Sequence, residues 1–192
     1  MSISRNFPFA VGLTAIILFT LPAAAQSIKK RPRRAAQTGP AAASLVRPCV
    51  SKWSLSSEEA ARLLADQNAV RNELGLPPLV WNAKLAETAS EWACRGKAAH
   101  RIDSPYGENI FVASNPQIAI ERVVAEWMTE KPYYNTATGD CRSDKTCNHY
   151  TQITWRRTSA VGCGINRSAT GKWPVLVVCN YDPPGNTGGK AF

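Results

Sequence analysis

The sequence contains six cysteines, and none of them belongs to a Cys-x-x-Cys pair. Zinc ribbons and redox-active dithiols use that spacing, so the pattern disfavours both classes. An even number of cysteines behind a signal-like N-terminus is typical of disulfide-bonded domains from an oxidising compartment. We therefore expect disulfides, with thiols clustered around a metal as the minor alternative. The six are Cys49, Cys94, Cys141, Cys147, Cys163 and Cys179.

The N-terminus has the pattern of a secretory signal peptide. Arg5 supplies a positive start, residues 7–21 are apolar, and the alanines before Gln26 provide a small-residue cleavage site. We expect cleavage near Ala25, which makes residues 1–25 the signal and the mature protein secreted or periplasmic. An uncleaved membrane anchor is the alternative, because the uncharged stretch is about long enough to span a bilayer.

The net charge of +9 is concentrated ahead of the domain. Residues 29–34 carry five cations, whereas residues 49–192 contain 16 basic and 14 acidic residues. Such a nearly neutral domain disfavours nucleic acid as a partner. Residues 26–48 are predicted to be a basic disordered linker. This linker is either a solvated spacer or a means of adhesion to an anionic envelope or membrane surface.

A capping box predicts the first helix of the domain at residues 49–192. Ser56 and Glu59 have the spacing at which each side chain accepts a hydrogen bond from the other residue's backbone N–H. Apolar residues then recur at helical spacing, and Gly75 is a typical helix stop. Gln67 falls within the apolar stripe, so we expect a polar side chain facing the core or a cleft beside it.

Two further helices are predicted from caps and apolar periodicity. The second follows Asn82. The third is expected to have Asn115 as its N-cap and Pro116 as its first residue, and to end at Pro132. Glu130 extends the apolar row of this third helix, and a carboxylate on a buried face needs a partner or a cleft.

The C-terminal third of the chain is predicted to be β structure. Residues 150–155, 160–165 and 175–179 are rich in β-branched and aromatic residues, which is typical of strands. The last two stretches are expected to form a hairpin that turns near Gly171.

Two disulfides are expected from these positions. Cys163 and Cys179 lie at equal distances from Gly171, so a symmetric hairpin places them opposite each other. Directly opposed residues of an antiparallel pair are close enough for a disulfide. Cys141 and Cys147 are expected to close a small loop.

The chain contains only two histidines, and their surroundings suggest a shared site. His100 precedes Glu108 by eight residues in a loop rich in proline and glycine, and His149 directly follows the small cysteine loop. Glu130 projects from the core side of its helix. Periodicity alone makes a cluster of two histidines and two glutamates a hypothesis, and separate structural roles for each remain the alternative.

Several segments resemble the CAP superfamily, which includes cysteine-rich secretory proteins, antigen 5 and plant pathogenesis-related 1 proteins. They are HYTQITW at 149–155 with VGC at 161–163, VCNYDPPGN at 178–186, YGEN at 106–109, GLPPLVW at 75–81 and WMTE at 127–130. All five occur in order across residues 58–186. The resemblance implies an α+β fold, a disulfide-bonded three-layer α-β-α sandwich with a small antiparallel sheet.

The resemblance also implies a cleft lined by two histidines and two glutamates. Carried over to this sequence, they are His100, Glu108, Glu130 and His149. In related proteins the two histidines hold zinc, which implies a weak zinc site at His100 and His149 with the glutamates close by. Neutral imidazoles are good zinc ligands and leave open positions for water, and a carboxylate can orient a ligand.

The sequence departs from the family pattern at three places. Gln67-Asn68 stands where the family commonly has His-Asn, and Arg101 stands where a serine often follows the first cleft histidine. A cation beside His100 disfavours binding of a second cation. One family cysteine is missing after the Gly-Cys-Gly position, and elimination then pairs Cys49 with Cys94.

Three functions are compatible with the sequence. The first is a secreted, non-enzymatic module of defence type that binds a small apolar ligand such as a sterol or fatty acid, or a protein. The second is a metal-dependent hydrolase with Glu108 or Glu130 as general base, although the sequence offers no third ligand and no catalytic serine. The third is a structural, envelope-associated domain in which the histidines tie the layers together. We expect a monomer in each case.

Overall fold

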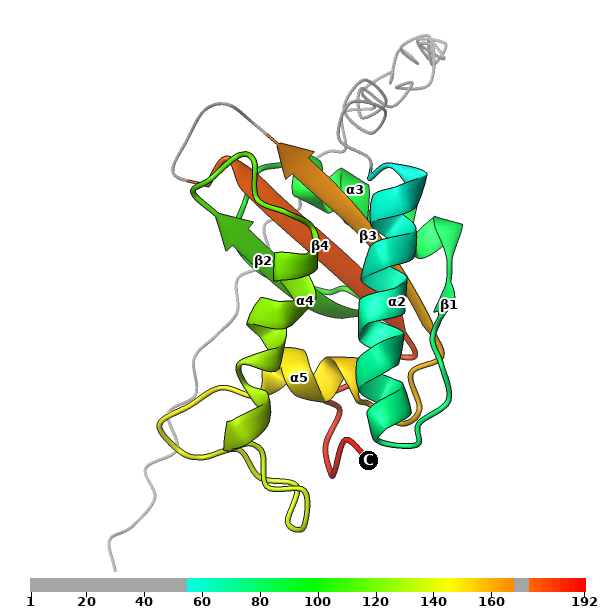
Figure 1. Cartoon of the computed structure of the whole chain (residues 1–192), viewed down its shortest axis with the longest axis vertical. Coiled ribbons are helices and arrows are strands. Elements are labelled where there is room, and N and C mark those ends of the chain that lie inside the picture. Colours follow the sequence, from blue (N-terminus) through cyan, green and yellow to red (C-terminus); the bar gives the residue numbers. More distant parts are fainter. Residues whose placement is uncertain (1–54, 168–172) are drawn as a thin grey trace, which may run out of the picture. The chain divides into compact units, whose positions relative to one another are not determined.

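The computed structural model describes residues 55–167 and 173–192 (Figure 1). The signal peptide and the basic linker predicted at residues 1–48 lie outside the described residues. No helix among the described residues has the length and apolar character needed to cross a membrane. In chain order the elements are α2 (Ser57–Glu73), β1 (Val80–Trp81), α3 (Ala83–Cys94), β2 (Gly107–Ala113), α4 (Glu121–Met128), the 3₁₀ helix η1 (Lys131–Tyr133), α5 (Asn148–Ile153), β3 (Ala160–Arg167) and β4 (Val175–Asp182).

The strands form one sheet in the order β1-β3-β4-β2. β4 pairs antiparallel with both β3 and β2. β1 pairs parallel with β3, with Val80 opposite Ala160. The sheet is therefore mixed and not wholly antiparallel as expected, because a long connection allows the short β1 to join in parallel.

Helices cover both faces of this sheet, which confirms the three-layer α-β-α sandwich. α3 packs on one face, where Ala89 and Ala93 meet Leu176 and Val178. α2, α4 and α5 pack on the other face, over a larger core centred on β3 and β4. Figure 1 shows α3 behind the sheet and the other three helices in front of it. β2 forms the sheet edge next to α4 and α5.

The first two helices begin where their caps predict. Ser56 Oγ accepts from the Glu59 N–H at 3.1 Å, and Glu59 Oε2 accepts from the Ser56 N–H at 2.9 Å. Asn82 Oδ1 accepts from the N–H groups of Lys84 and Leu85. These capping bonds satisfy backbone donors that have no partner inside the helix, so they fix the start of α2 and α3.

Three expectations about local structure are wrong. α4 begins at Glu121, not at Pro116, because the Asn115 side chain accepts from the Gln117 N–H and closes a short turn instead of capping a helix. The stretch predicted as a strand at residues 150–155 belongs mostly to the helix α5. The third helix also ends at Met128, ahead of the 3₁₀ turn that contains Pro132.

Two of the three predicted disulfides are present among the described residues. Cys163 faces Cys179 in the β3–β4 register with the Cα atoms 4.0 Å apart, and Cys141 is bonded to Cys147. Cys94 is also disulfide-bonded. Its predicted partner, Cys49, lies outside the described residues.

Arg71 is a fully buried cation of α2. Its Nε donates to Pro77 O at 2.7 Å. Its Nη atoms donate to the carbonyl oxygens of Ile153, Trp155 and Thr158 at 2.8–3.0 Å. Burial lowers the pKa of the guanidinium, since removal from water penalises the charged form. The side chain therefore joins α2 to the loop before β1 and to the segment between the end of α5 and β3.

The contact between α3 and β3 depends on Gly162. A Cβ atom at this position would lie 2.5 Å from Asn82 O and 2.7 Å from Leu85 C, and it would also meet Ala86 N. All three are backbone atoms of the first turn of α3, which cannot move aside as a side chain does. The glycine thus sets the distance between one helix layer and the sheet.

Candidate functional site

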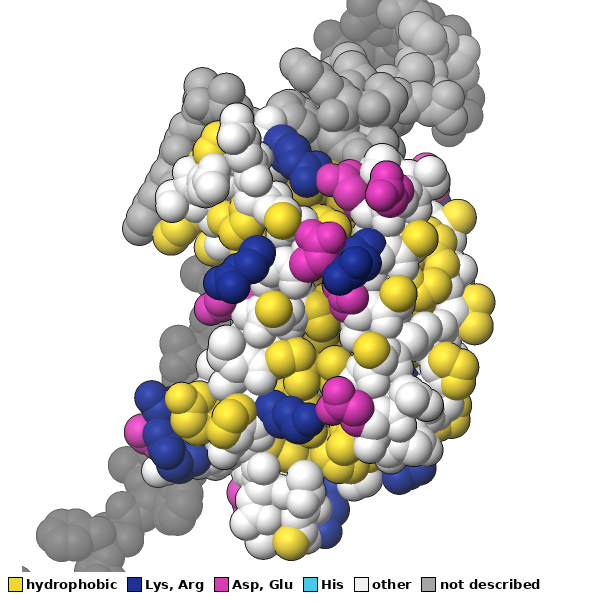
Figure 2. Space-filling model, in the orientation of Figure 1, with side chains coloured by type: hydrophobic (Ala, Val, Ile, Leu, Met, Phe, Trp, Pro, Cys, Tyr) yellow, Lys and Arg dark blue, Asp and Glu magenta, His cyan; other side chains and the backbone are white. Residues whose placement is uncertain are grey.

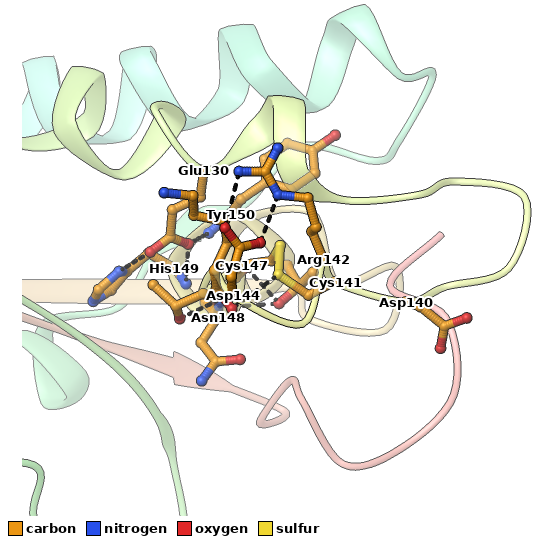
Figure 3. The surroundings of a disulfide bond; sticks show 12 residues. Glu130, Asp140, Cys141, Arg142, Asp144, Cys147, Asn148, His149 and Tyr150 are labelled. Atoms are coloured by element: carbon orange, nitrogen blue, oxygen red, sulfur yellow. Dashed lines mark hydrogen bonds and ion pairs between the residues drawn. A yellow bond between two sulfur atoms is a disulfide. The ribbon is translucent and has the colours of Figure 1, made fainter.

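Glu130 and His149 form a partly buried pair between α4 and α5. Glu130 lies just after α4, between its C-cap Thr129 and η1, and its Oε1 lies 2.6 Å from His149 Nδ1. Its other oxygen, Oε2, accepts from the backbone N–H groups of His149 at 2.8 Å and Tyr150 at 3.0 Å. Figure 3 shows the carboxylate of Glu130 facing the start of α5. The glutamate therefore caps this helix and orients the imidazole at the same time.

Two neighbours fix the position of the His149 ring further. The Trp127 indole stacks on it, with ring centroids 6.0 Å apart and an interplanar angle of 14°. Trp127 is itself held by a hydrogen bond from its Nε1 to Ile110 O. Cys147, the residue before α5, is tied to Cys141 (Figure 3). Because Nδ1 faces Glu130, Nε2 is the nitrogen left for a ligand.

His100 and Glu108 form a second pair, at the start of β2. His100 Nδ1 lies 2.9 Å from Glu108 Oε1, which also accepts from the Arg101 N–H at 3.1 Å. The imidazole is 66% exposed, whereas the glutamate side chain is only 6% exposed. Glu108 Oε2 is buried and has no hydrogen-bond partner among the described residues. An unpaired buried carboxylate oxygen is costly, so it marks a place where a cation or water would be stabilised.

A polar chain connects the two pairs through the residue after Glu108. Asn109 Nδ2 donates to His149 O at 3.0 Å and to the Tyr181 hydroxyl at 3.2 Å. Tyr181 in turn donates to Gln67 Oε1 at 2.7 Å, and Gln67 Nε2 donates to Leu63 O. The hydroxyl of Tyr181 is fully buried, and burial raises its pKa above the ordinary range. Gln67 thus faces the core, as predicted, and joins α2 to the site.

A pocket of about 380 Å³ lies beside the Glu130–His149 pair. One wall is apolar and comes from the edge strand β2 and from Trp127. The other wall is polar and includes Glu126, Tyr133 and Lys145. His100 and Glu108 do not line this pocket. The four predicted residues therefore form two His–Glu pairs, of which one opens into the pocket.

A second hollow of about 390 Å³ lies between the first turns of α2 and α4. Ala61, Ala65 and Ile120 contribute its apolar floor. Charged residues stand on both sides, including the ion pair of Arg62 with Glu121 at 3.8 Å. Figure 2 shows hydrophobic side chains between the two helices, with acidic and basic side chains along the margins. This groove is separate from the His–Glu pairs.

The two His–Glu pairs contain donor types that divalent metals accept. Each imidazole has Nδ1 directed at a carboxylate, the arrangement that orients Nε2 of a metal-binding histidine. The buried, unpaired Oε2 of Glu108 adds a negative charge next to His100. Within the described part of the chain, no group of three or more His, Cys, Asp or Glu side chains is placed to hold one ion. Two imidazoles alone are few ligands, and few ligands make weak binding.

Two residues of the site, Asn109 and Tyr181, were not predicted from the sequence to be site residues. For Asn109 a signal was present, because Glu108-Asn109 is a polar pair at the start of an apolar stretch. Tyr181 lies in the buried strand β4, where most of the other residues are apolar, and nothing local distinguishes its hydroxyl from that of an ordinary core tyrosine.

Comparison with known proteins identifies the class of this fold and site. The model of the cysteine-rich secretory protein family, CAP, matches residues 64–181. The chain belongs to this family.

Individual relatives agree with this assignment. The chain is 37% identical over 156 residues to the pathogenesis-related protein PRMS of Zea mays, spanning 78% of this chain and 88% of that protein. It is 38% identical over 132 residues to pathogenesis-related protein PR-1 of Medicago truncatula, spanning 67% and 76%. The structure of venom allergen-like protein 4 of Schistosoma mansoni superposes with a TM-score of 0.59 at 27% identity, covering 71% of this chain and 95% of that one.

Proposed function

We propose that this CAP domain is a secreted, non-enzymatic module of defence type that binds a small apolar ligand in the pocket beside Glu130 and His149. The observation that carries the proposal is the two-sided character of that pocket, with an apolar wall from β2 and Trp127 and the oriented imidazole on its polar side. Ligand pockets are typically apolar with a few fixed polar groups. The names of the pathogenesis-related relatives support a defence role.

A hydrolase is less well supported by the geometry. A general base must have an oxygen free to take a proton from its substrate. Both oxygens of Glu130 already accept hydrogen bonds, two of them from backbone N–H groups that have no other partner at the helix start. Glu130 therefore serves to position His149. Glu108 Oε2 has no partner, but it is buried away from solvent.

The ligand proposal is tested by filling the pocket. Thr129 lines it and is exposed, so Thr129→Trp should occupy its volume without disturbing the core. We expect at least a tenfold loss of affinity for a fluorescent fatty acid or sterol, followed by fluorescence titration. Ala125→Trp is the matched control, because Ala125 is exposed on the same helix and does not line the pocket. Equal binding by both variants, or no binding by the native protein, would refute the proposal.

The metal proposal makes a separate prediction. We expect zinc to bind weakly at pH 7.5 and to be lost at pH 5.5, because an imidazole ligates a metal only when it is neutral. The sequence contains only two histidines, so His100→Ala and His149→Ala each remove one of its two imidazoles. Calorimetric titration should show at least a tenfold loss for both variants. His100 is largely exposed, so its variant should keep the fold of the native chain. Unchanged zinc affinity in this folded variant would contradict a shared site.

A further inference from the structure

A third pocket, of about 320 Å³, lies between the loop after α5 and the C-terminal residues. It is separate from both His–Glu pairs. Three of its lining residues are cations: Arg156, Arg157 and Lys190. Among the described residues, no aspartate or glutamate lines it. A concave surface with several cations and no acidic side chain has a positive potential that is focused by its walls.

The two arginines have no partner for their charge. Both are exposed, and within residues 55–167 and 173–192 neither guanidinium forms an ion pair or a hydrogen bond. Three other arginines of the described residues are ion-paired: Arg62 with Asp66, Arg142 with Asp144 and Arg167 with Glu59. Arg156 and Arg157 therefore retain their full capacity to donate to a ligand.

The segment that carries these arginines is fixed in place. The Arg156 N–H donates to Ala191 O at 2.7 Å, which ties the loop to the C-terminal residues across the pocket. The Thr158 N–H donates to Trp155 O at 3.1 Å and closes a turn around both arginines. A cationic pocket on a fixed backbone loses less entropy when an anion binds than one on a loose loop.

Arg71 adds a buried positive charge beneath this turn. Its guanidinium donates to the carbonyl oxygens of Trp155 and Thr158, the residues on either side of the arginine pair. It has only carbonyl partners, so no carboxylate neutralises it. After burial, the positive charge of Arg156 is a further cause that lowers the Arg71 pKa, which reflects repulsion between these like charges. Buried charge is poorly screened by salt, so the positive potential persists in physiological buffer.

We propose that this pocket is an oxyanion site that takes a phosphate or sulfate group of a small molecule, with Arg156 and Arg157 as its ligands. A tetrahedral oxyanion has enough acceptor oxygens to receive donors from two guanidinium groups at once, and the planar fork of arginine matches it well. Bound anion would also offset the repulsion between Arg71 and Arg156. The site requires no metal and no participation of either His–Glu pair.

The test uses the full chain, to which inorganic phosphate or sulfate is added at constant ionic strength. NMR follows the backbone and indole resonances of Trp155 during the titration. Trp155 lines the pocket, so these resonances report the site and not the basic segment at residues 29–34. We expect saturable shifts with either anion. Arg156→Gln and Arg157→Gln should each weaken binding about tenfold, the usual magnitude for one charge-assisted hydrogen bond.

Arg122→Gln is the matched control, because Arg122 is an exposed cation of α4 outside the pocket. It should bind as the native chain does. Comparing the affinities of glucose 6-phosphate and glucose 6-sulfate distinguishes a site for phosphate esters from a site for sulfate esters. The type of ester that the site takes should bind more tightly. Three results would overturn the proposal. They are shifts that do not saturate, equal shifts on addition of chloride, and a loss of anion binding in Arg122→Gln as large as in the Arg156 and Arg157 variants.

Discussion

Replacing Arg71 with leucine should lower the free energy of unfolding by at least about 4 kcal/mol, the largest effect that we expect from a single substitution here. The guanidinium satisfies four backbone carbonyl oxygens, at Pro77, Ile153, Trp155 and Thr158. Leucine fills part of the volume but donates nothing. Each buried carbonyl left without a donor costs about 1–3 kcal/mol. Denaturant unfolding followed by circular dichroism measures the loss.

Two variants make this result specific to the hydrogen bonds. Arg71→Lys keeps the charge, but an ammonium has three donors and cannot reach four acceptors, so we expect an intermediate loss. Arg62→Leu removes an exposed arginine from the same helix, together with its bond to Asp66, and should change stability by less than about 1 kcal/mol. If Arg71→Leu and Arg62→Leu were equally stable, the proposed role of the buried cation would be wrong.

Gly162→Ala should destabilise the domain by about 3 kcal/mol, because the added methyl group has no space between β3 and α3. Its neighbours are backbone atoms of Asn82, Leu85 and Ala86, so relief requires the whole helix to shift away from the sheet. We expect a lower midpoint of thermal unfolding without loss of the native secondary structure. Calorimetry measures the change in the unfolding midpoint and enthalpy.

Gly107→Ala is the matched control for this substitution. Gly107 is also a strand glycine, and its added Cβ would lie 2.8 Å from Gln152 Cδ. That neighbour belongs to a side chain, which can rotate at the cost of its hydrogen bond with the Gly185 N–H. We therefore expect roughly half the loss found for Gly162→Ala. A larger loss at Gly107 would show that side-chain packing, and not the spacing of the layers, limits the fold.

Local sequence signals were sufficient to predict those features of the fold that depend on residues close together in the chain. The caps at Ser56 and Asn82 and the register of Cys163 with Cys179 each depend on a short span of chain, and the structure contains all three. Resemblance to the CAP family singled out the four His and Glu positions. Their division into two pairs could not be predicted, because it depends on the path of β2 relative to α5.

The helix α5 shows why other features were missed. Residues 150–155, most of which belong to it, contain two threonines, an isoleucine and two aromatic residues, a composition that favours a strand. Glu130, which lies 19 residues earlier, accepts the first N–H groups of this segment and stabilises a helix instead. Thr151 and Thr154 also donate their hydroxyls to carbonyls of the preceding turn, at Cys147 and Tyr150. Tertiary capping of this kind is invisible to a local pattern. The burial of Arg71 was missed for the same reason.

The partners of α2 have a consequence for the order in which the chain folds. Arg71 bonds to residues 82 to 87 positions later, and Gln67 bonds to Tyr181, 114 positions later. The first helix of the domain therefore emerges from the ribosome long before the strands that it packs against. Contacts this distant in sequence close slowly, because loop entropy is lost before they form. A nascent chain must keep this helix undocked until almost the last strand has been synthesised, and truncation before Tyr181 would remove the hydrogen-bond partner of Gln67.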